Sequence, residues 1–271
     1  MAYALLRKSY ALLGWRQAEG GRGMDDTDGT GLPPSIEAAW GLRERPGKGP
    51  RPGLSIDRIV GAAVDVAGAE GLAAVSMGRV AKELGASTMS LYRYVAAKDE
   101  LYLLMVDRAV GPPPPPPAPG TGWREALTDW AWAQRAALRR NLWALRVPIT
   151  GPPMTPNSVA WWEWGMVALE NTGLDEGTKI SVIVLVGGYV RSEAALMADI
   201  DAAIRATGDT PQQVMARYGR TLRRLADPDR YPAVARMLAA GVLDEPDTPD
   251  YEFRFGLERV LDGVGLLIAG E

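Results

Sequence analysis

The sequence contains no cysteine and no histidine. Without cysteine there can be no disulfide framework, no thiolate nucleophile and no cysteine-ligated zinc. Without histidine the commonest general base and metal ligand are missing, so a Ser-His-Asp or Cys-His hydrolase is excluded. Carboxylate or lysine chemistry stays open, but Lys179 is the single lysine after residue 110. We therefore predict that the protein is not an enzyme and uses no metal or cofactor.

Long apolar runs are also missing. No stretch reaches the 18 or so apolar residues that a membrane-spanning helix needs, and the longest candidate, residues 180–190, is better explained as a buried helix. The first residues contain no uninterrupted apolar core, which a signal peptide requires. We expect a cytoplasmic protein that does not interact with a membrane.

No segment alternates polar and apolar residues as a half-buried strand does, so the sequence predicts an all-α fold. Ser55, Ser76 and Ser87 each precede a short apolar pattern with helical period, and a fourth helix begins near Lys98. Four short helices within about 55 residues, joined in part by a glycine-containing turn at Gly85, are typical of a helix-turn-helix unit.

The composition divides the chain into four parts. Residues 1–53 are rich in glycine, aspartate and proline and are predicted to be a mostly flexible extension that ends in a basic arm, with a short helix at Ser35–Leu42 as the one candidate element. Residues 54–110 form the helix-turn-helix domain, and "GPPPPPPAPGTG" (111–122) is a semi-rigid linker. Residues 123–271 carry only helical patterns and form a larger C-terminal domain.

Charge is distributed unevenly along the chain, whose net charge is −3. Residues 41–98 contain nine Lys and Arg against five Asp and Glu, whereas residues 111–271 contain sixteen against twenty. Positive charge is therefore concentrated in the arm and the helix-turn-helix unit, the part of the chain expected to contact the phosphates of a nucleic acid. Four of the nine cations lie in the proline-containing arm, which could follow a minor groove or serve only as a solubilising tail.

Two segments resemble a known family. The strings "AAVDVAGAEGLAAVSMGRVAKELGAS", "LYRYV" and "KDEL" within residues 55–110 resemble the DNA-binding domain of the tetracycline-repressor (TetR-like) family. The string "YEFRFGLERVLDGVGLLI" is similar to the last helix of that family's regulatory domain. The resemblance implies DNA contact through residues 88–90 and 92–94, a phosphate clamp at Lys98, and a C-terminal domain that dimerises and holds a ligand.

The helix that begins at Ser87 is the predicted reading helix. Leu91 and Val95 point inward, which leaves small polar and apolar side chains toward a major groove and tyrosines toward phosphates. The alternative is that the tyrosines pack a small core. The predicted DNA-binding residues are Arg43, Arg45, Lys48, Arg51, Ser76, Arg79, Ser87, Thr88, Met89, Ser90, Tyr92, Arg93, Tyr94 and Lys98.

Seven of the nine tryptophans lie between Trp123 and Trp164. Trp161, Trp162 and Trp164 point in different directions around a helix, so they cannot all face one core. We expect an aromatic-lined pocket for a bulky, largely apolar ligand, with packing residues alone as the alternative. The predicted ligand-binding residues are Trp130, Gln134, Asn141, Trp161, Trp162, Met166, Tyr189 and Glu193.

These features predict a ligand-responsive transcriptional repressor. It would bind a pseudo-palindromic double-stranded DNA operator as a homodimer, assembled through helices 175–207 and 249–269, and would be released by a small-molecule effector. The alternative is an activator or a DNA-binding regulator that needs no ligand. The name-giving family member recognises tetracycline with histidine and magnesium, and that mode cannot apply to a chain without histidine.

Overall fold

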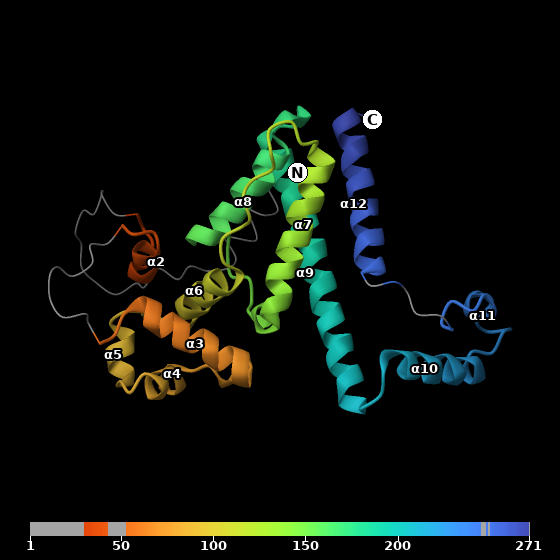
Figure 1. Cartoon of the computed structure of the whole chain (residues 1–271), viewed down its shortest axis with the longest axis horizontal. Helices are drawn as coiled ribbons and strands as arrows, with labels where there is room; N and C mark the ends of the chain where they lie inside the picture. The colour runs from red at the N-terminus through yellow and green to blue at the C-terminus, as the bar shows by residue number, and fades with distance from the viewer. Residues whose placement is uncertain (1–29, 43–52, 245–247, 249, 271) are drawn as a thin grey trace.

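The computed structural model describes residues 30–42, 53–244, 248 and 250–270, and the four predicted arm cations all lie outside these ranges. Within them every regular element is a helix (Figure 1), as the sequence predicts. The N-terminal elements are α2 (Pro34–Ala39), α3 (Ile56–Glu70), η1 (Leu72–Ala74), α4 (Met77–Glu83), α5 (Thr88–Tyr92) and α6 (Lys98–Val110). The C-terminal elements are α7 (Trp123–Arg140), η2 (Leu142–Arg146), α8 (Pro156–Ala168), η3 (Glu170–Thr172), α9 (Glu176–Thr207), α10 (Pro211–Leu225), α11 (Pro232–Ala239) and α12 (Tyr251–Ala269).

Serine caps define the helices of the N-terminal domain. The side chains of Ser55, Ser76 and Ser87 each accept a hydrogen bond from the backbone N–H three residues later, which satisfies a donor that the helix leaves open. The inward side chains, Leu91 among them, pack into one apolar core with α6. Leu91 and Val95 are fully buried, as their spacing predicts.

The predicted flexible extension contains an ordered helix. In α2, Ile36 is fully buried in the core of the helix-turn-helix domain, and the Ser35 hydroxyl donates to the Glu100 carboxylate at 2.7 Å. The short helix that the sequence indicates at residues 35–42 is therefore present, with the bounds Pro34–Ala39. An isolated six-residue helix is not stable in water, so α2 depends on this tertiary contact.

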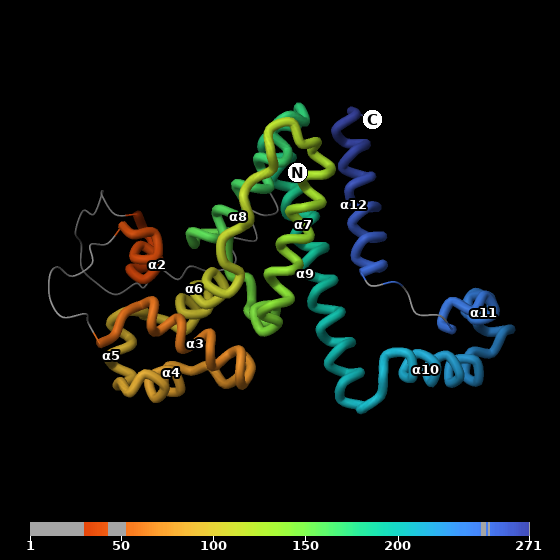
Figure 2. Tube along the Cα trace, viewed as in Figure 1, coloured from red at the N-terminus to blue at the C-terminus, as the bar shows by residue number. Residues whose placement is uncertain are grey.

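The C-terminal domain is a bundle of α7, α8, α9 and α12 (Figures 1 and 2). Trp130, Val186, Phe253 and Leu261 lie in its core. The 32-residue helix α9 is long and apolar enough to cross a membrane by composition, but its face bearing Val186 packs against α7 in the bundle. Helices α10 and α11 extend away from the bundle beyond the end of α9.

Two helix boundaries differ from the sequence prediction. In the sequence, residues at helical spacing continue from Trp123 as far as Leu145, which by itself would predict one helix, but Asn141 has non-helical torsions and α7 ends at Arg140. The chain then turns through η2, which places Trp143 in the core of the N-terminal domain rather than in the bundle. The last helix begins at Tyr251 rather than at Pro249, because Asp250 adopts a left-handed conformation with φ of 63°.

Candidate DNA-binding face and regulatory cavity

The exposed surface of α5 is the candidate reading face. Met89 is 75% exposed and Tyr92 is 45% exposed, and Arg93 lies beside them at the end of the helix. Thr88 and Ser90 are on the same short helix. Because Leu91 is fully buried beneath them, the backbone that presents these side chains is held in a fixed orientation.

Tyr94 does not belong to the exposed set. It is half-buried and packs against the apolar core of the N-terminal domain. Tyr92 and Tyr94 are two residues apart, which is about 200° around a helix, so the two rings lie on different sides and do not share one exposed face, contrary to the prediction. The core-packing alternative therefore describes Tyr94, whereas Tyr92 remains available to a partner.

Four more of the predicted DNA contacts are engaged within the fold. The Ser76 and Ser87 side chains cap α4 and α5, and the Ser87 and Ser90 hydroxyl oxygens are 2.8 Å apart. Arg79 bridges Glu70 at 2.7 Å and Glu83 at 2.6 Å, and its hydrogen bond to Glu70, followed by that to Glu83, raises its pKa above the usual arginine value. These residues hold the candidate DNA-binding face in shape. Because their polar groups already bond within the fold, they are less available for direct contact with phosphate.

The start of α6 offers a different kind of contact. Lys98 is its first residue and is exposed, with its ammonium 5.1 Å from the centre of the Tyr102 ring. The preceding N-cap residue is Ala97, whose side chain cannot accept a hydrogen bond from the first turn. A cation beside open backbone donors at a helix start is a favourable position for a phosphate.

The tryptophans of the predicted ligand-binding set do not line either of the two cavities described below, and two of them make hydrogen bonds within the fold. Trp130 is 1% exposed and donates its indole hydrogen to the Trp161 carbonyl oxygen at 3.0 Å. Trp161 in turn donates to the Gly111 carbonyl oxygen at 2.9 Å, and the Asn141 amide donates to Ala109 at 3.0 Å. Each of these three residues therefore fastens one part of the fold to another. The apolar spacing of the sequence does not reveal such hydrogen bonds.

The remaining predicted ligand residues are distributed over the bundle. Trp162 and Met166 are half-buried against its core, and the Tyr189 hydroxyl donates to the carbonyl oxygens of Glu252 and Phe253. The side-chain oxygen of Gln134 is buried and has no hydrogen-bond partner among the described residues. Glu193 alone of the eight predicted residues lines the large cavity described next.

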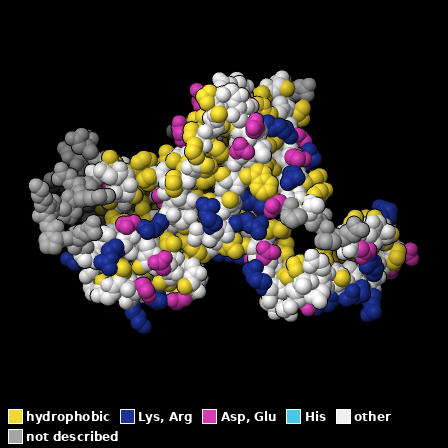
Figure 3. Space-filling model, viewed as in Figure 1, with side chains coloured by type: hydrophobic (Ala, Val, Ile, Leu, Met, Phe, Trp, Pro, Cys, Tyr) yellow, Lys and Arg dark blue, Asp and Glu magenta, His cyan; other side chains and the backbone are white. Residues whose placement is uncertain are grey.

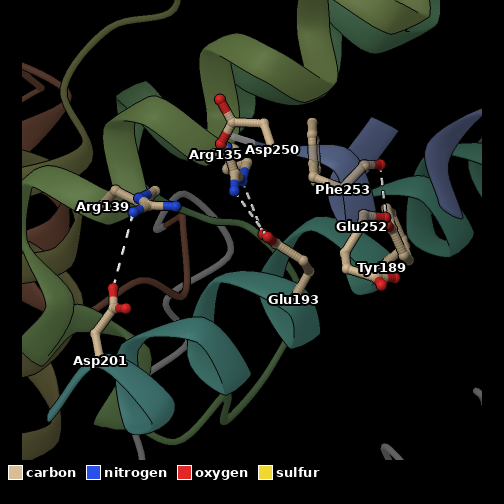
Figure 4. Close-up of polar contacts among 8 residues, drawn as sticks. All are labelled: Arg135, Arg139, Tyr189, Glu193, Asp201, Asp250, Glu252 and Phe253. Atoms are coloured by element: carbon tan, nitrogen blue, oxygen red, sulfur yellow. Dashed lines mark hydrogen bonds and ion pairs between the residues drawn. The ribbon is translucent and has the colours of Figure 1, made fainter. Parts of the chain in front are cut away.

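That cavity has a volume of about 880 Å³ and lies between α7, α9, α10 and the start of α12. Arg135 lines it, is 5% exposed, and makes two hydrogen bonds of 2.8 Å to Glu193 and one of 2.7 Å to Asp250 (Figure 4). Its guanidinium also lies 4.4 Å from the centre of the Phe253 ring. Burial disfavours the charge, but the bonds to Glu193 and Asp250 outweigh it and hold the pKa of Arg135 above its usual value.

Apolar side chains surround this charged group. They come from α9, α10 and α12, and they are Met197, Ile200, Ile204, Met215 and Phe253. Arg135 was not among the predicted ligand-binding residues, although the sequence held a signal for it: it occupies the inward stripe of α7, four residues after Ala131 and three before Leu138. An arginine in an apolar stripe needs a buried partner.

The two domains are joined by polar contacts between α6 and α8. The Asp107 carboxylate accepts hydrogen bonds from the backbone N–H groups of Asn157 at 3.0 Å and Ser158 at 3.1 Å, in the first turn of α8. With the Trp161–Gly111 bond, this fixes α8 to the end of α6. A displacement of α8 or α7 in the bundle would therefore move α6, which packs on α3.

Similarity to known proteins agrees with this architecture. The family model described as "Bacterial regulatory proteins, tetR family" matches residues 59–105, and "Tetracyclin repressor-like, C-terminal domain" matches residues 116–267. The HTH-type transcriptional repressor DrrR1 of Streptomyces coeruleorubidus is 38% identical over 253 residues, which is 92% of each chain. An HTH-type transcriptional regulator of Saccharopolyspora erythraea is 30% identical over 56% of this chain and 64% of its own length.

Solved structures show the same fold. ActR of Streptomyces coelicolor in complex with actinorhodin is 29% identical, with a TM-score of 0.66 over 80% of this chain and 99% of ActR. Apo ActR is 28% identical, with a TM-score of 0.64 over 80% of this chain and 99% of ActR. The helix-turn-helix domain, the helical C-terminal domain and these matches confirm the resemblance that the sequence motifs indicate. The chain belongs to the tetracycline-repressor family of DNA-binding transcriptional regulators.

Proposed function

We propose that the protein is a ligand-responsive transcriptional repressor that binds a pseudo-palindromic operator as a homodimer. One observation carries the proposal: an exposed reading helix is connected, through α6 and the polar contacts at Asp107 and Gly111, to a helical bundle with a cavity of about 880 Å³. An effector that fits the cavity better in one arrangement of α7 and α8 shifts the population toward that arrangement. The reading helices of the two subunits then lose the spacing that the operator requires.

Relatives support the direction of control. DrrR1 is named a transcriptional repressor, and ActR has been solved with actinorhodin and with (S)-DNPA bound. Applied to this chain, these names favour repression relieved by a small molecule over activation. The cavity favours the same proposal over a regulator that needs no ligand. The site of action would be the cytoplasm, where the chain can reach DNA.

The effector that we propose is bulky and largely apolar, as the methionine and isoleucine walls of the cavity favour. It would lie against Arg135, whose charge is already balanced by Glu193 and Asp250. A ligand with polar groups directed at this cluster gains orientation, while the apolar walls supply most of the contact area.

The proposed dimer uses the outer faces of α9 and α12. Val184 and Leu185 on α9 and Leu266 and Leu267 on α12 are exposed although they are large and apolar. Apolar side chains gathered on two neighbouring helices suit a four-helix interface made from two helices of each subunit. Gly188 on α9 is also exposed, and a Cβ added there would touch nothing within 4 Å in the single chain.

Gly188→Arg tests this assembly. The substitution leaves the subunit core intact because the position is open, but it places a charged side chain in the proposed interface. We expect a monomer in sedimentation velocity and at least about a tenfold loss of affinity for a two-half-site operator, because the half-sites are no longer bound by one linked particle. Arg220→Gly on α10 is the control that changes an exposed arginine outside this face. An intact dimer of Gly188→Arg at micromolar concentration would reject the interface.

The function is tested by sequencing the DNA fragments that the full-length protein retains from its own genome. We expect one or a few inverted repeats upstream of genes, and higher expression of a reporter behind such a fragment when the regulator is deleted. Lower reporter expression after deletion would identify an activator. A library of bulky apolar compounds should then contain effectors that release the fragment, and Glu193→Gln should alter their potency without altering DNA affinity.

A further inference from the structure

A second cleft lies where the two domains meet. It has a volume of about 500 Å³ and is bounded by the last turn of α3, by η2, and by the ends of α7 and α9. Gly68 and Gly71 come from the DNA-binding domain, and Arg140 and Arg205 come from the bundle. It is separate from the large cavity, although Arg139 contributes to the walls of both.

The charged lining of this cleft is strongly basic. Arg139, Arg140, Arg146 and Arg205 line it together with Asp199, which pairs with Arg146. Arg139 is 4.0 Å from Asp201, and the guanidinium groups of Arg140 and Arg205 have no hydrogen-bond or ion-pair partner among the described residues. Lys and Arg side chains gather over this middle part of the molecule in Figure 3.

Nearby helix ends reduce this positive charge without cancelling it. The carbonyl ends of α3, α7 and α9 each contribute about half a negative charge. The lining itself carries a net three positive charges from its four arginines and one aspartate. A cleft with walls of low dielectric concentrates such a field, so an anion is the favoured occupant.

The cleft also has apolar walls, which a site for a simple inorganic anion would not need. Leu72, Leu142, Trp143 and Leu145 line it. Trp143 is only 8% exposed, and its buried indole N–H has no acceptor among the residues that the structure describes. A buried donor without an acceptor costs free energy, and an oxygen of a bound molecule could accept from it.

We propose that this interdomain cleft is a second binding site, for a small amphiphilic anion such as an aromatic carboxylate or sulfonate. The acidic group would lie between Arg140 and Arg205, and the ring system would pack on Trp143 and the leucines. Because the walls belong to both domains, the occupant fixes their relative orientation. It would therefore act directly on the junction of the two domains, at a place distinct from the large cavity.

DNA phosphate is the competing partner for these arginines. Two observations favour the small molecule. The cleft is concave with apolar walls, which duplex DNA cannot enter, and it lies at the end of α3 opposite to the one beside the reading helix α5 (Figure 1). A phosphate backbone running along α5 would have to turn sharply to reach it.

The test uses two fluorescent probes on the full-length protein. 8-Anilinonaphthalene-1-sulfonate is an aromatic anion, and N-phenyl-1-naphthylamine is its uncharged counterpart without the sulfonate. The variant Arg140→Glu/Arg205→Glu reverses the two unpaired charges of the cleft. Its matched control is Arg220→Glu/Arg224→Glu on α10, which makes the same change of net charge at two exposed arginines that do not line the cleft.

We expect the cleft variant to weaken binding of the sulfonate by at least about tenfold, since attraction becomes repulsion, and to leave binding of the uncharged probe within about twofold. The control should bind both probes like the wild type. Arg140→Gln/Arg205→Gln should give an intermediate loss, and it serves in place of the reversal if thermal unfolding shows that the latter does not fold.

Two results would overturn the proposal. One is an equal effect of the cleft and control variants on the sulfonate, or an equal loss of both probes, because the cleft would then not recognise the charge. The other is unchanged sulfonate binding together with weaker binding to a random-sequence duplex, because the arginines would then serve DNA. These measurements need no operator, so their outcome is independent of whether the protein is a repressor.

Discussion

Gly256 lies where α12 passes the ring of Tyr189, and a Cβ at this position would overlap that ring. Tyr189 cannot easily move away, because its hydroxyl donates to the carbonyl oxygens of Glu252 and Phe253 at 3.0 Å each and its ring stacks on Phe253 with centroids 5.8 Å apart. One absent side chain thus permits the close contact of α9 with α12 that closes the bundle.

Gly256→Ala should destabilise the protein. Overpacking costs about 1–3 kcal/mol, whereas replacing a helical glycine by alanine stabilises the helix by about 1 kcal/mol, so we expect a net loss of up to about 2 kcal/mol in urea denaturation. Gly263→Ala is the control on the same helix, because a Cβ there meets nothing within 4 Å and only the helix gain applies. Equal effects of the two substitutions would show that Tyr189 yields to the added methyl group.

Arg135 is the second residue on which the bundle depends. Removing it leaves the Glu193 carboxylate, itself 8% exposed, buried without its partner. We expect Arg135→Met to cost about 3–5 kcal/mol, and Arg135→Met/Glu193→Leu to cost distinctly less, because the double variant leaves no unpaired buried charge. Chemical denaturation of the single and double variants measures this coupling. If the double variant is less stable than Arg135→Met, the ion pair is not the reason for the loss.

At the scale of the element, α5 shows how a short helix becomes a reading surface. It has only five residues, too few for a stable isolated helix, and it is held by the Ser87 cap and by Leu91 in the core. The serine cap, the inward leucine and the exposed Met89 and Tyr92 all follow from the sequence pattern. The half-buried position of Tyr94 does not, because it depends on how α5 packs against the neighbouring helices.

Phosphate contacts from this region should affect affinity more than specificity. We expect Tyr92→Phe and Lys98→Ala each to weaken operator binding by about 1 kcal/mol, the scale of one hydrogen bond, while the ranking of operator variants stays the same because phosphate contacts carry no sequence information. Met89→Ala, at the most exposed position of α5, is the contrasting variant and should change that ranking. Competition binding with a set of mutated operators separates the two effects, and wild-type affinity for both Tyr92→Phe and Lys98→Ala would reject this face.

At the scale of the whole molecule, the basic arm is joined to the helix-turn-helix domain on both sides. Helix α2 precedes the arm in the chain and buries Ile36 in the same core to which α3 contributes. Deleting everything before Gly53 would therefore remove part of that core together with the arm. The cations have to be replaced by substitution rather than removed by truncation.

The variant Arg43→Ala/Arg45→Ala/Lys48→Ala/Arg51→Ala tests the arm and leaves α2 in place. If the arm binds DNA, affinity falls and the plot of log affinity against log salt becomes flatter by about 0.9 for each phosphate that is no longer neutralised. Thermal stability should not change, because Ile36 and the capped start of α3 are retained. An unchanged salt slope would show that the arm is a solubilising segment and that the domain binds DNA without it.

The order of the residues was enough to determine which segments are helices, where most of them begin, and which family the chain belongs to. Serine caps, glycine stops and helical apolar spacing are local properties, and they act through the backbone within a few residues. The exposed side chains of the candidate reading helix were predicted for the same reason. A polar side chain directed outward on a short capped helix is visible in the order of the residues.

The positions of the cavities, and the groups that surround them, emerged only from the packing of the helices. Arg135, Glu193 and Asp250 are far apart in sequence, and they meet because α7, α9 and the start of α12 pack side by side. Trp161, predicted to line a pocket, instead bonds to Gly111 at the junction of the domains. A hydrogen bond or an ion pair between distant segments depends on how helices cross, and helix crossing is set by the whole core rather than by local pattern.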